Sequence, residues 1–242
     1  MVQSIHAVLR NALESAVREE IIPRNVAKLV PVAAPKYKIN RGLTVQQAKV
    51  TLQAASEHRL AALYVLALYL GLRRGELFGL RWQDVDLDGA KLEVVQTLQR
   101  VSGALCAVPP KTEDSARTIP LPPPCVRALR EHQQRQTAEC EHAWPDSEDH
   151  GLVFPSRRGT PMEPDNLRRS WTQIRRAAGL DAVRFHDLRH TCVTLLLDLG
   201  VPPHVVREIA GHSDIDVTMT IYAHVSLEEK RRALRKLGEA LG

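Results

Sequence analysis

The chain opens with apolar residues that recur every three or four positions, which is the spacing of one face of an amphipathic helix. The stripe consists of Ile5, Val8, Leu9, Ala12, Leu13, Ala16 and Val17. One helix cannot bury such a stripe by itself. Residues 1–30 are therefore expected to be the last helix of a preceding domain. Residues 31–42 are basic and contain Pro31 and Pro35, which predicts a linker.

A second pattern of helices follows the linker. Thr44 and Gln47 have the spacing of a capping box, so a helix is expected from there to about Ser56. The run from Leu60 to Leu70 is apolar on all faces, which predicts a buried helix that Gly71 ends. A further short helix should carry Glu76.

Residues 90–121 change to the alternating pattern of strands. Lys91–Val95 and Arg117–Leu121 each predict a short strand, and Asp88-Gly89 predicts a turn. Lys111 lies between the two strands, on a hairpin or its loop. The region is expected to form a small antiparallel sheet.

The rest of the chain is expected to be helical. Prolines at 122–124 start a helix that runs to about Glu139, and the polar, acidic residues 139–151 predict a surface loop. Further helices are expected at about 165–178, 186–199, 203–210 and 227–240. The fold class is therefore mainly α with a small antiparallel β-sheet (α+β), and residues 43–242 should form one domain.

Composition adds little more than the kind of partner. The 242 residues carry a formal net charge of +5, which favours a polyanionic partner. The four cysteines form no C-x-x-C pair and are expected to be reduced thiols of a cytosolic protein. The longest apolar run, from Leu60 to Leu72, is too short to span a bilayer, so no membrane partner is expected.

Residues with chemical potential occur in four separate phrases. These are Gly71-Leu-Arg-Arg, Pro110-Lys-Thr, His186-Asp-Leu-Arg-His190, and Gly211-His followed ten residues later by a tyrosine. In their order and spacing the phrases resemble the tyrosine recombinase (phage integrase) family. Each phrase alone is weak, but the ordered set is specific. The six matching positions are Arg73, Lys111, His186, Arg189, His212 and Tyr222.

The resemblance covers roughly residues 43 to 242 and implies a tyrosine-recombinase catalytic domain, with residues 1–30 as the remnant of a core-binding domain. It implies site-specific recombination or integration, in which strands are cut and rejoined through a 3′-phosphotyrosine. Neither metal, ATP nor another cofactor is expected, because the phosphotyrosine conserves the energy of the phosphodiester bond.

The chemistry explains why these residue types are needed. Two planar guanidiniums, Arg73 and Arg189, can each grip non-bridging phosphate oxygens, and His212 can donate to the same oxygens. Tyr222 supplies the nucleophile and needs a base because its phenol ionises only near pH 10. His186 is the candidate base. Lys111 is the candidate acid for the leaving 5′-oxygen, as the resemblance implies.

Glu76 follows Arg73 by one helical turn and is expected to orient it. The basic pairs Arg157-Arg158, Arg168-Arg169 and Arg175-Arg176 are candidates for phosphate contacts, although such pairs are equally common on solvated surfaces.

The resemblance also implies partners. These are double-stranded DNA, accessory DNA-bending proteins and further copies of the chain in a homotetramer on DNA, the free protein being a monomer in the bacterial cytoplasm or nucleoid. The tail helix, residues 226–242, has Leu227, Leu234 and Leu237 on one face and would dock on a neighbouring subunit.

Three alternatives remain open. A type IB topoisomerase-like strand transferase would use similar chemistry, and a catalytically silent relative would only bind DNA. A metallohydrolase would use His186 and His190, which are four residues apart, but position 187 is Asp and no third ligand is evident. Taken singly, Lys111 is also compatible with a surface lysine and Tyr222 with an aromatic that packs beside Ile221.

Overall fold

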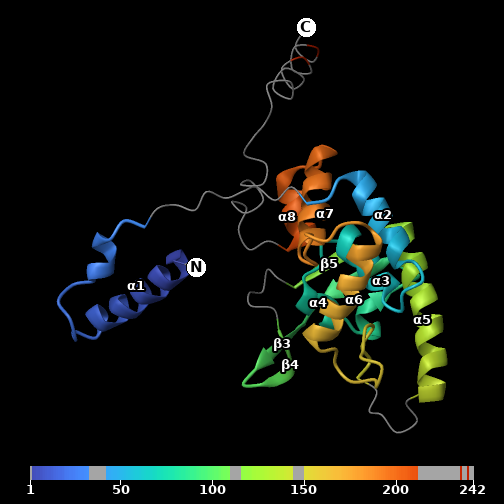
Figure 1. Cartoon of the computed structure of the whole chain (residues 1–242), viewed down its shortest axis with the longest axis horizontal. Helices are drawn as coiled ribbons and strands as arrows, with labels where there is room; N and C mark the ends of the chain where they lie inside the picture. The colour runs from blue at the N-terminus through green and yellow to red at the C-terminus, as the bar shows by residue number, and fades with distance from the viewer. Residues whose placement is uncertain are drawn as a thin grey trace. The chain divides into compact units, whose positions relative to one another are not determined.

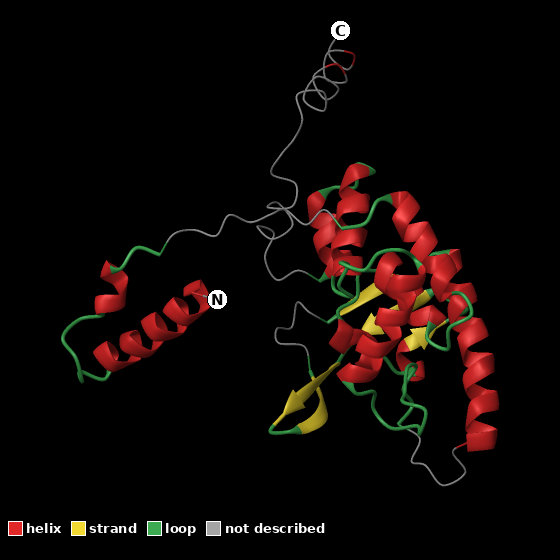
Figure 2. Ribbon diagram, viewed as in Figure 1, coloured by secondary structure: helices red, strands yellow, loops and turns green. Residues whose placement is uncertain are grey.

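The computed structural model describes residues 2–32, 42–109, 116–143 and 150–211, together with Arg235 and Glu239. The chain divides into two compact units, Met1–Ile39 (unit 1) and Asn40–Gly242 (unit 2), each visible in Figures 1 and 2. Most of the expected linker and nearly all of the expected tail helix lie outside the described residues.

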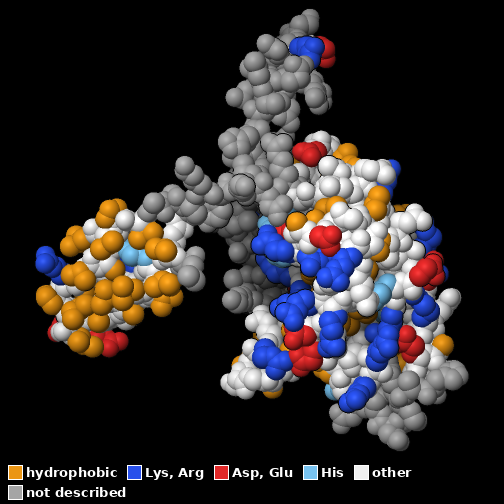
Figure 3. Space-filling view, viewed as in Figure 1, with side chains coloured by type: hydrophobic (Ala, Val, Ile, Leu, Met, Phe, Trp, Pro, Cys, Tyr) orange, Lys and Arg blue, Asp and Glu red, His pale blue; other side chains and the backbone are white. Residues whose placement is uncertain are grey.

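Unit 1 is one long helix folded back on a short turn. The helix α1 (Val2–Arg18) begins where the apolar pattern predicts, and the 3₁₀ turn η1 (Val26–Leu29) packs against it. Asn25 holds the return, since its Nδ2 donates to Arg10 O and to Glu14 Oε2, both at 2.8 Å. Val2 and Val8 remain about two-thirds exposed, and Figure 3 shows hydrophobic side chains over the visible face of this unit.

Unit 2 begins with three helices. The helix α2 (Val45–Ala55) starts with the predicted capping box between Thr44 and Gln47. The helix α3 (Ala61–Tyr69) is buried almost all round, as its uniformly apolar sequence predicts, and packs against α2 as well as later helices. Gly71, at φ +62°, follows its end. The short helix α4 (Arg74–Gly79) comes next and carries Glu76.

The strands form two sheets where one was expected. The strands β1 (Val85–Asp86), β2 (Lys91–Val94) and β5 (Arg117–Pro120) make an antiparallel sheet in the order β1-β2-β5. The strands β3 (Thr97–Val101) and β4 (Ala104–Val108) make a separate hairpin, and a 3₁₀ turn η2 (Trp82–Asp84) precedes β1. Lys111 lies outside the described residues.

Four helices complete the described part of unit 2. The helix α5 (Pro123–Ala143) runs into the segment expected to be loop, so the predicted end near Glu139 was wrong by about one turn. The others, α6 (Pro164–Ala177), α7 (Asp187–Asp198) and α8 (Pro203–Ala210), lie within one or two residues of their expected bounds. Figure 1 shows α7 and α8 side by side, and the two helices contact each other.

The core of unit 2 is built around α3. Tyr64 on α3 is fully buried beside Trp171 and Phe185, with ring centroids 5.8 and 6.1 Å away, and its hydroxyl bonds with Ser170 Oγ at 2.6 Å. The chain enters this core next to α7, because Leu43 N donates to Thr191 Oγ1 at 2.8 Å. The helices that carry the candidate site thus share one packed interior.

Candidate functional site

Charged side chains from three elements meet at the C-terminal end of α8. Arg73 begins α4, Arg117 begins β5, and Arg189 lies in the first turn of α7. All three donate hydrogen bonds to main-chain carbonyls of residues 209–211. Carbonyls at a helix end carry partial negative charge and lack partners within the helix, so they hold the guanidiniums in place.

Arg73 and Glu76 bond to each other in the way predicted for a positioned arginine. Glu76 accepts from the backbone N of Arg73 and from its Nη1, both at 2.8 Å. The Nη2 of Arg73 donates to Gly211 O. The left-handed conformation of Gly71 and its close approach to Cys192 Sγ bring this turn against α7. The Arg73 guanidinium is thereby fixed, while 40% of its side-chain surface remains exposed.

Arg189 is almost completely withdrawn from water, with 3% of its surface exposed. Its Nη1 donates to Gly71 O at 2.6 Å and to Ala210 O, and its Nη2 has no hydrogen-bond partner within the described residues. Burial lowers the pKa of Arg189, and the nearby Arg73 lowers it further. A guanidinium nevertheless stays protonated at neutral pH. A buried cation with a spare donor is costly unless an anion pairs with it, so this arrangement fits an oxyanion such as a phosphate.

Arg117 is a site residue that the sequence reasoning did not select. Its Nη2 lies 3.1 Å from Glu76 Oε2, and only 9% of its side chain is exposed. The signal that could have found it is strand alternation: Arg117 and Ile119 share one face of β5, and Ile119 is buried. An arginine on an inward face needs a partner, and here that partner is Glu76.

Glu76 is the anion at the centre of the three arginines. Burial alone would raise the pKa of Glu76, but Arg117 and Arg73 outweigh it and hold this pKa below its usual value. Glu76 is therefore ionised at neutral pH. Three guanidiniums around one carboxylate leave the cluster with excess positive charge, which suits a bound phosphodiester.

His186 stands at the N-terminus of α7, three residues before Arg189. Its ring meets that of His190 edge to face, with centroids 4.9 Å apart. Partial burial lowers the pKa of His186, and His190 and Arg189 add to the effect. The imidazole is therefore neutral at pH 7, which is the form that can accept a proton.

The other three predicted catalytic residues, Lys111, His212 and Tyr222, lie outside the described residues. The chain reaches His212 directly after Gly211, whose carbonyl accepts from Arg73. The structure therefore brings Arg73, Glu76 and Arg189 together and ends the described chain one residue before the next expected member.

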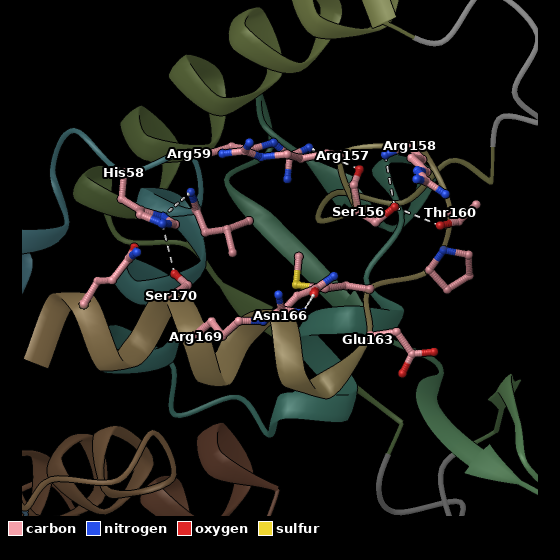
Figure 4. Close-up of a pocket in the computed structure, with 14 residues that line it drawn as sticks. His58, Arg59, Ser156, Arg157, Arg158, Thr160, Glu163, Asn166, Arg169 and Ser170 are labelled. Atoms are coloured by element: carbon pink, nitrogen blue, oxygen red, sulfur yellow. Dashed lines mark hydrogen bonds between the residues drawn. The ribbon is translucent and has the colours of Figure 1, made fainter.

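A basic pocket of about 560 Å³ lies elsewhere in unit 2. In Figure 4, Arg59, Arg157 and Arg158 lie on one side of it, and Asn166 and Arg169 of α6 lie on the other. Glu139 pairs with Arg59 at 2.8 Å, and Glu163 is the acidic side chain among the described lining residues. Lys and Arg side chains also gather around α6 on the face seen in Figure 3. The pocket is thus suited to an anionic ligand.

Nothing in the described segments favours the metallohydrolase. Those segments contain no group of three His, Cys, Asp or Glu side chains placed to hold a metal ion. Asp187, which stands where a zinc hydrolase of this motif would have Glu, is paired with Arg184 at 2.9 Å. All four cysteines are free of disulfides. No helix among residues 2–32, 42–109, 116–143 and 150–211 is long and apolar enough to cross a membrane.

The fold is that of tyrosine recombinase catalytic domains. The chain resembles the Tn1549 transposon integrase, solved in complex with a circular intermediate DNA, with a TM-score of 0.78 and 23% identity over 98% of this chain and 78% of that one. The XerA recombinase gives a TM-score of 0.61 and 24% identity over 98% of this chain and 76% of that one. The predicted fold class is confirmed.

The chain belongs to the phage integrase family, whose model matches residues 41–229. It is 32% identical over 256 residues to the "tyrosine recombinase XerC-like" protein of Caldanaerobacter subterraneus, which covers 98% of this chain and 66% of that protein. It is 34% identical over 234 residues to an integrase of Streptomyces ambofaciens, which covers 91% and 58%. The chain thus spans less than two thirds of the length of these relatives.

Proposed function

We propose that this chain carries the catalytic domain of a site-specific tyrosine recombinase that cuts and rejoins DNA. The observation that carries the proposal is the meeting of Arg73 and Arg189, far apart in sequence, at the end of α8. There Arg189 has a donor without a partner among the described residues, and Arg73 keeps an exposed side. The family match and the order of the six motif positions support the same function.

In the proposed reaction, Tyr222 Oη attacks the scissile phosphorus and the bond from phosphorus to the 5′-oxygen breaks. The phenol proton passes to neutral His186, and the leaving 5′-oxygen takes a proton from Lys111. Arg73, Arg189 and His212 hold the non-bridging oxygens as negative charge increases. One phosphoester replaces another, so the strand can be rejoined by the reverse steps without ATP or a metal.

The test uses a pool of end-labelled duplexes of random sequence, each nicked so that the released fragment diffuses away. Adducts are counted on a denaturing gel. The parent and a Tyr69→Phe control, whose tyrosine is an exposed residue of α3, should form adducts. Tyr222→Phe should form none. Adducts of equal yield in Tyr222→Phe would overturn the assignment of the nucleophile.

The basic pocket is the proposed contact surface for the DNA backbone. Its arginines outnumber its acidic side chains, and phosphates are the groups that such a surface binds without reading sequence. Arg157, Arg158 and Arg169 are the proposed contacts.

The domain organisation is likewise a proposal. Residues 1–30 would be the last part of a core-binding domain, 31–42 its linker, and 43–242 the catalytic domain. Support comes from the exposed apolar face of α1 and from the greater length of the relatives.

The proposed assembly is a homotetramer on two DNA duplexes, in which the tail, residues 226–242, docks on a neighbour. A heterologous contact of this kind closes into a ring. Deleting residues 226–242 should leave DNA binding intact and reduce complexes of higher order in native gels. Unchanged complexes would show that the tail has no role in assembly.

A further inference from the structure

Arg117 connects two parts of the site that are distant in sequence. From the start of β5 its side chain reaches Glu76 on α4 and the last carbonyls of α8. We propose that Arg117 is a positioning residue for strand cleavage, which fixes Glu76 beneath Arg73 and fixes the turn that leads to His212. The inference rests on the proposed recombinase function and adds a residue that the six-position motif does not contain.

The contacts of Arg117 use its whole planar fork. Nε donates to Ile209 O at 3.1 Å and Nη2 to Ala210 O at 3.2 Å. Nη1 donates to Glu76 Oε1 at 3.3 Å and Nη2 to Glu76 Oε2 at 3.1 Å. A lysine has its donors at one point and cannot span both the carboxylate and the helix end. The geometry therefore requires arginine at this position.

Gly211 shows how closely the chain approaches this guanidinium. A Cβ atom at Gly211 would lie 2.5 Å from Arg117 Cζ, and Gly211 has φ +67°. Only glycine combines that conformation with that approach. Because Arg73 also donates to Gly211 O, the position of Arg117 sets the position of the residue just before His212.

Electrostatics give Arg117 a second effect on Arg73. The charged groups that face Glu76 are Arg73 at the start of its own helix, Arg117 from β5 and Arg189 from α7. Without Arg117, the burial of Glu76 would act against one cation fewer, and the pKa of Glu76 would rise. A protonated Glu76 loses part of its capacity to accept from the Arg73 backbone and guanidinium.

The experiment measures adduct formation with the nicked random-sequence duplexes as a function of pH. Arg117→Gln should cut the rate by roughly 10- to 100-fold at neutral pH, by analogy with residues that orient metal ligands. DNA affinity in a filter-binding assay should be unchanged within about 2-fold, since the phosphate-binding groups remain. The deficit should widen as pH falls. Arg130→Gln, which removes an exposed arginine paired with Asp88, is the matched control and should behave as the parent.

The Glu76→Gln background separates positioning from general damage. There Arg117→Gln should add no new pH dependence, because position 76 no longer titrates. Arg117→Lys should recover little of the rate but more of the stability, since it keeps the charge and loses the fork. A deficit that is uniform in pH and tracks lost stability would overturn the proposal, as would an unchanged rate.

A parent that forms no adduct would overturn the proposed function instead. Arg117 would then be judged by thermal unfolding between pH 7 and pH 4. In the parent the lowered pKa of Glu76 gives stability that is lost only as pH falls through that folded-state value. In Arg117→Gln the loss should begin at higher pH, and coincident profiles of the two proteins would refute the link.

Discussion

A guanidinium that is almost removed from water needs an anion, and this requirement connects the burial of Arg189 with the proposed chemistry. Its donors point to fixed acceptors, Gly71 O and Ala210 O, which hold the planar group in one orientation. A preorganised donor of this kind acts on the transition state more than on binding.

The substitution Arg189→Lys tests that orientation. Lysine keeps the charge but has no second arm, so cleavage of the nicked duplexes should slow by about 10²-fold or more, with little change in DNA affinity. The rates come from single-turnover adduct formation. A rate near that of the parent would mean that Arg189 only supports packing.

The pH dependence of cleavage tests His186. Its pKa is lowered from the ordinary 6.5, so the neutral base persists below that pH and is lost as pH falls through the folded-state value. The parent should therefore keep its rate to a pH below 6.5 and then decline. His186→Gln should be slow without that inflection, whereas the exposed His150→Gln should keep it. An inflection that persists in His186→Gln would assign it to another group.

At the residue scale, sequence predicts residue types better than their contacts. Arg73, Glu76 and Arg189 stand in recognisable phrases, and the structure brings them together. Arg117 stands in no such phrase. Its ion pair with Glu76 joins positions 41 residues apart, and local spacing carries no information on a contact of that separation.

At the element scale, helices followed from pattern and strands followed less well. The capping box at Thr44 and the apolar run of α3 have local causes, so their bounds were predictable. The β3–β4 hairpin was missed as a separate sheet, because its placement depends on contact with α4. Gly75 and Gly79 allow that contact: a Cβ atom on them would lie 3.0 Å from Leu98 O and 3.1 Å from Leu98 N, respectively.

The end of α8 gives a prediction at this scale. Gly211→Ala adds left-handed strain and pushes on an arginine whose bonds to Glu76 and α8 prevent it from moving freely. Gly179→Ala has nearly the same conformation, φ +68° against +67°, and open space. The control should lose about 1–2 kcal/mol of unfolding free energy in urea. Gly211→Ala should lose about 1–3 kcal/mol more, and equal losses would show that Arg117 yields easily.

At the scale of the whole molecule, the site belongs entirely to unit 2, and the proposed DNA surface lies in that unit too. Net charge alone suggested a polyanionic partner, but not where it binds. The fold supplies the location, because the basic pocket collects arginines from the segment before α6 and from α6 itself.

Salt dependence tests this surface. The logarithm of the affinity for duplex DNA should fall linearly with the logarithm of salt concentration, with a slope of about −0.9 for each phosphate contacted. Replacing Arg157, Arg158 and Arg169 by Gln should make the slope shallower by about one for each phosphate that is no longer bound. Arg130→Gln should leave it unchanged. An unaltered slope in the triple variant would place the DNA elsewhere.

The linkage in the covalent adduct tests the central claim most directly. The adduct formed with nicked duplexes is digested with protease and nuclease, and the modified peptide is sequenced by mass spectrometry. The predicted result is a nucleotide joined through its 3′-phosphate to Tyr222, with a free 5′-hydroxyl on the released strand. A nucleotide on any other residue, or one joined through its 5′-phosphate, would contradict the proposed mechanism.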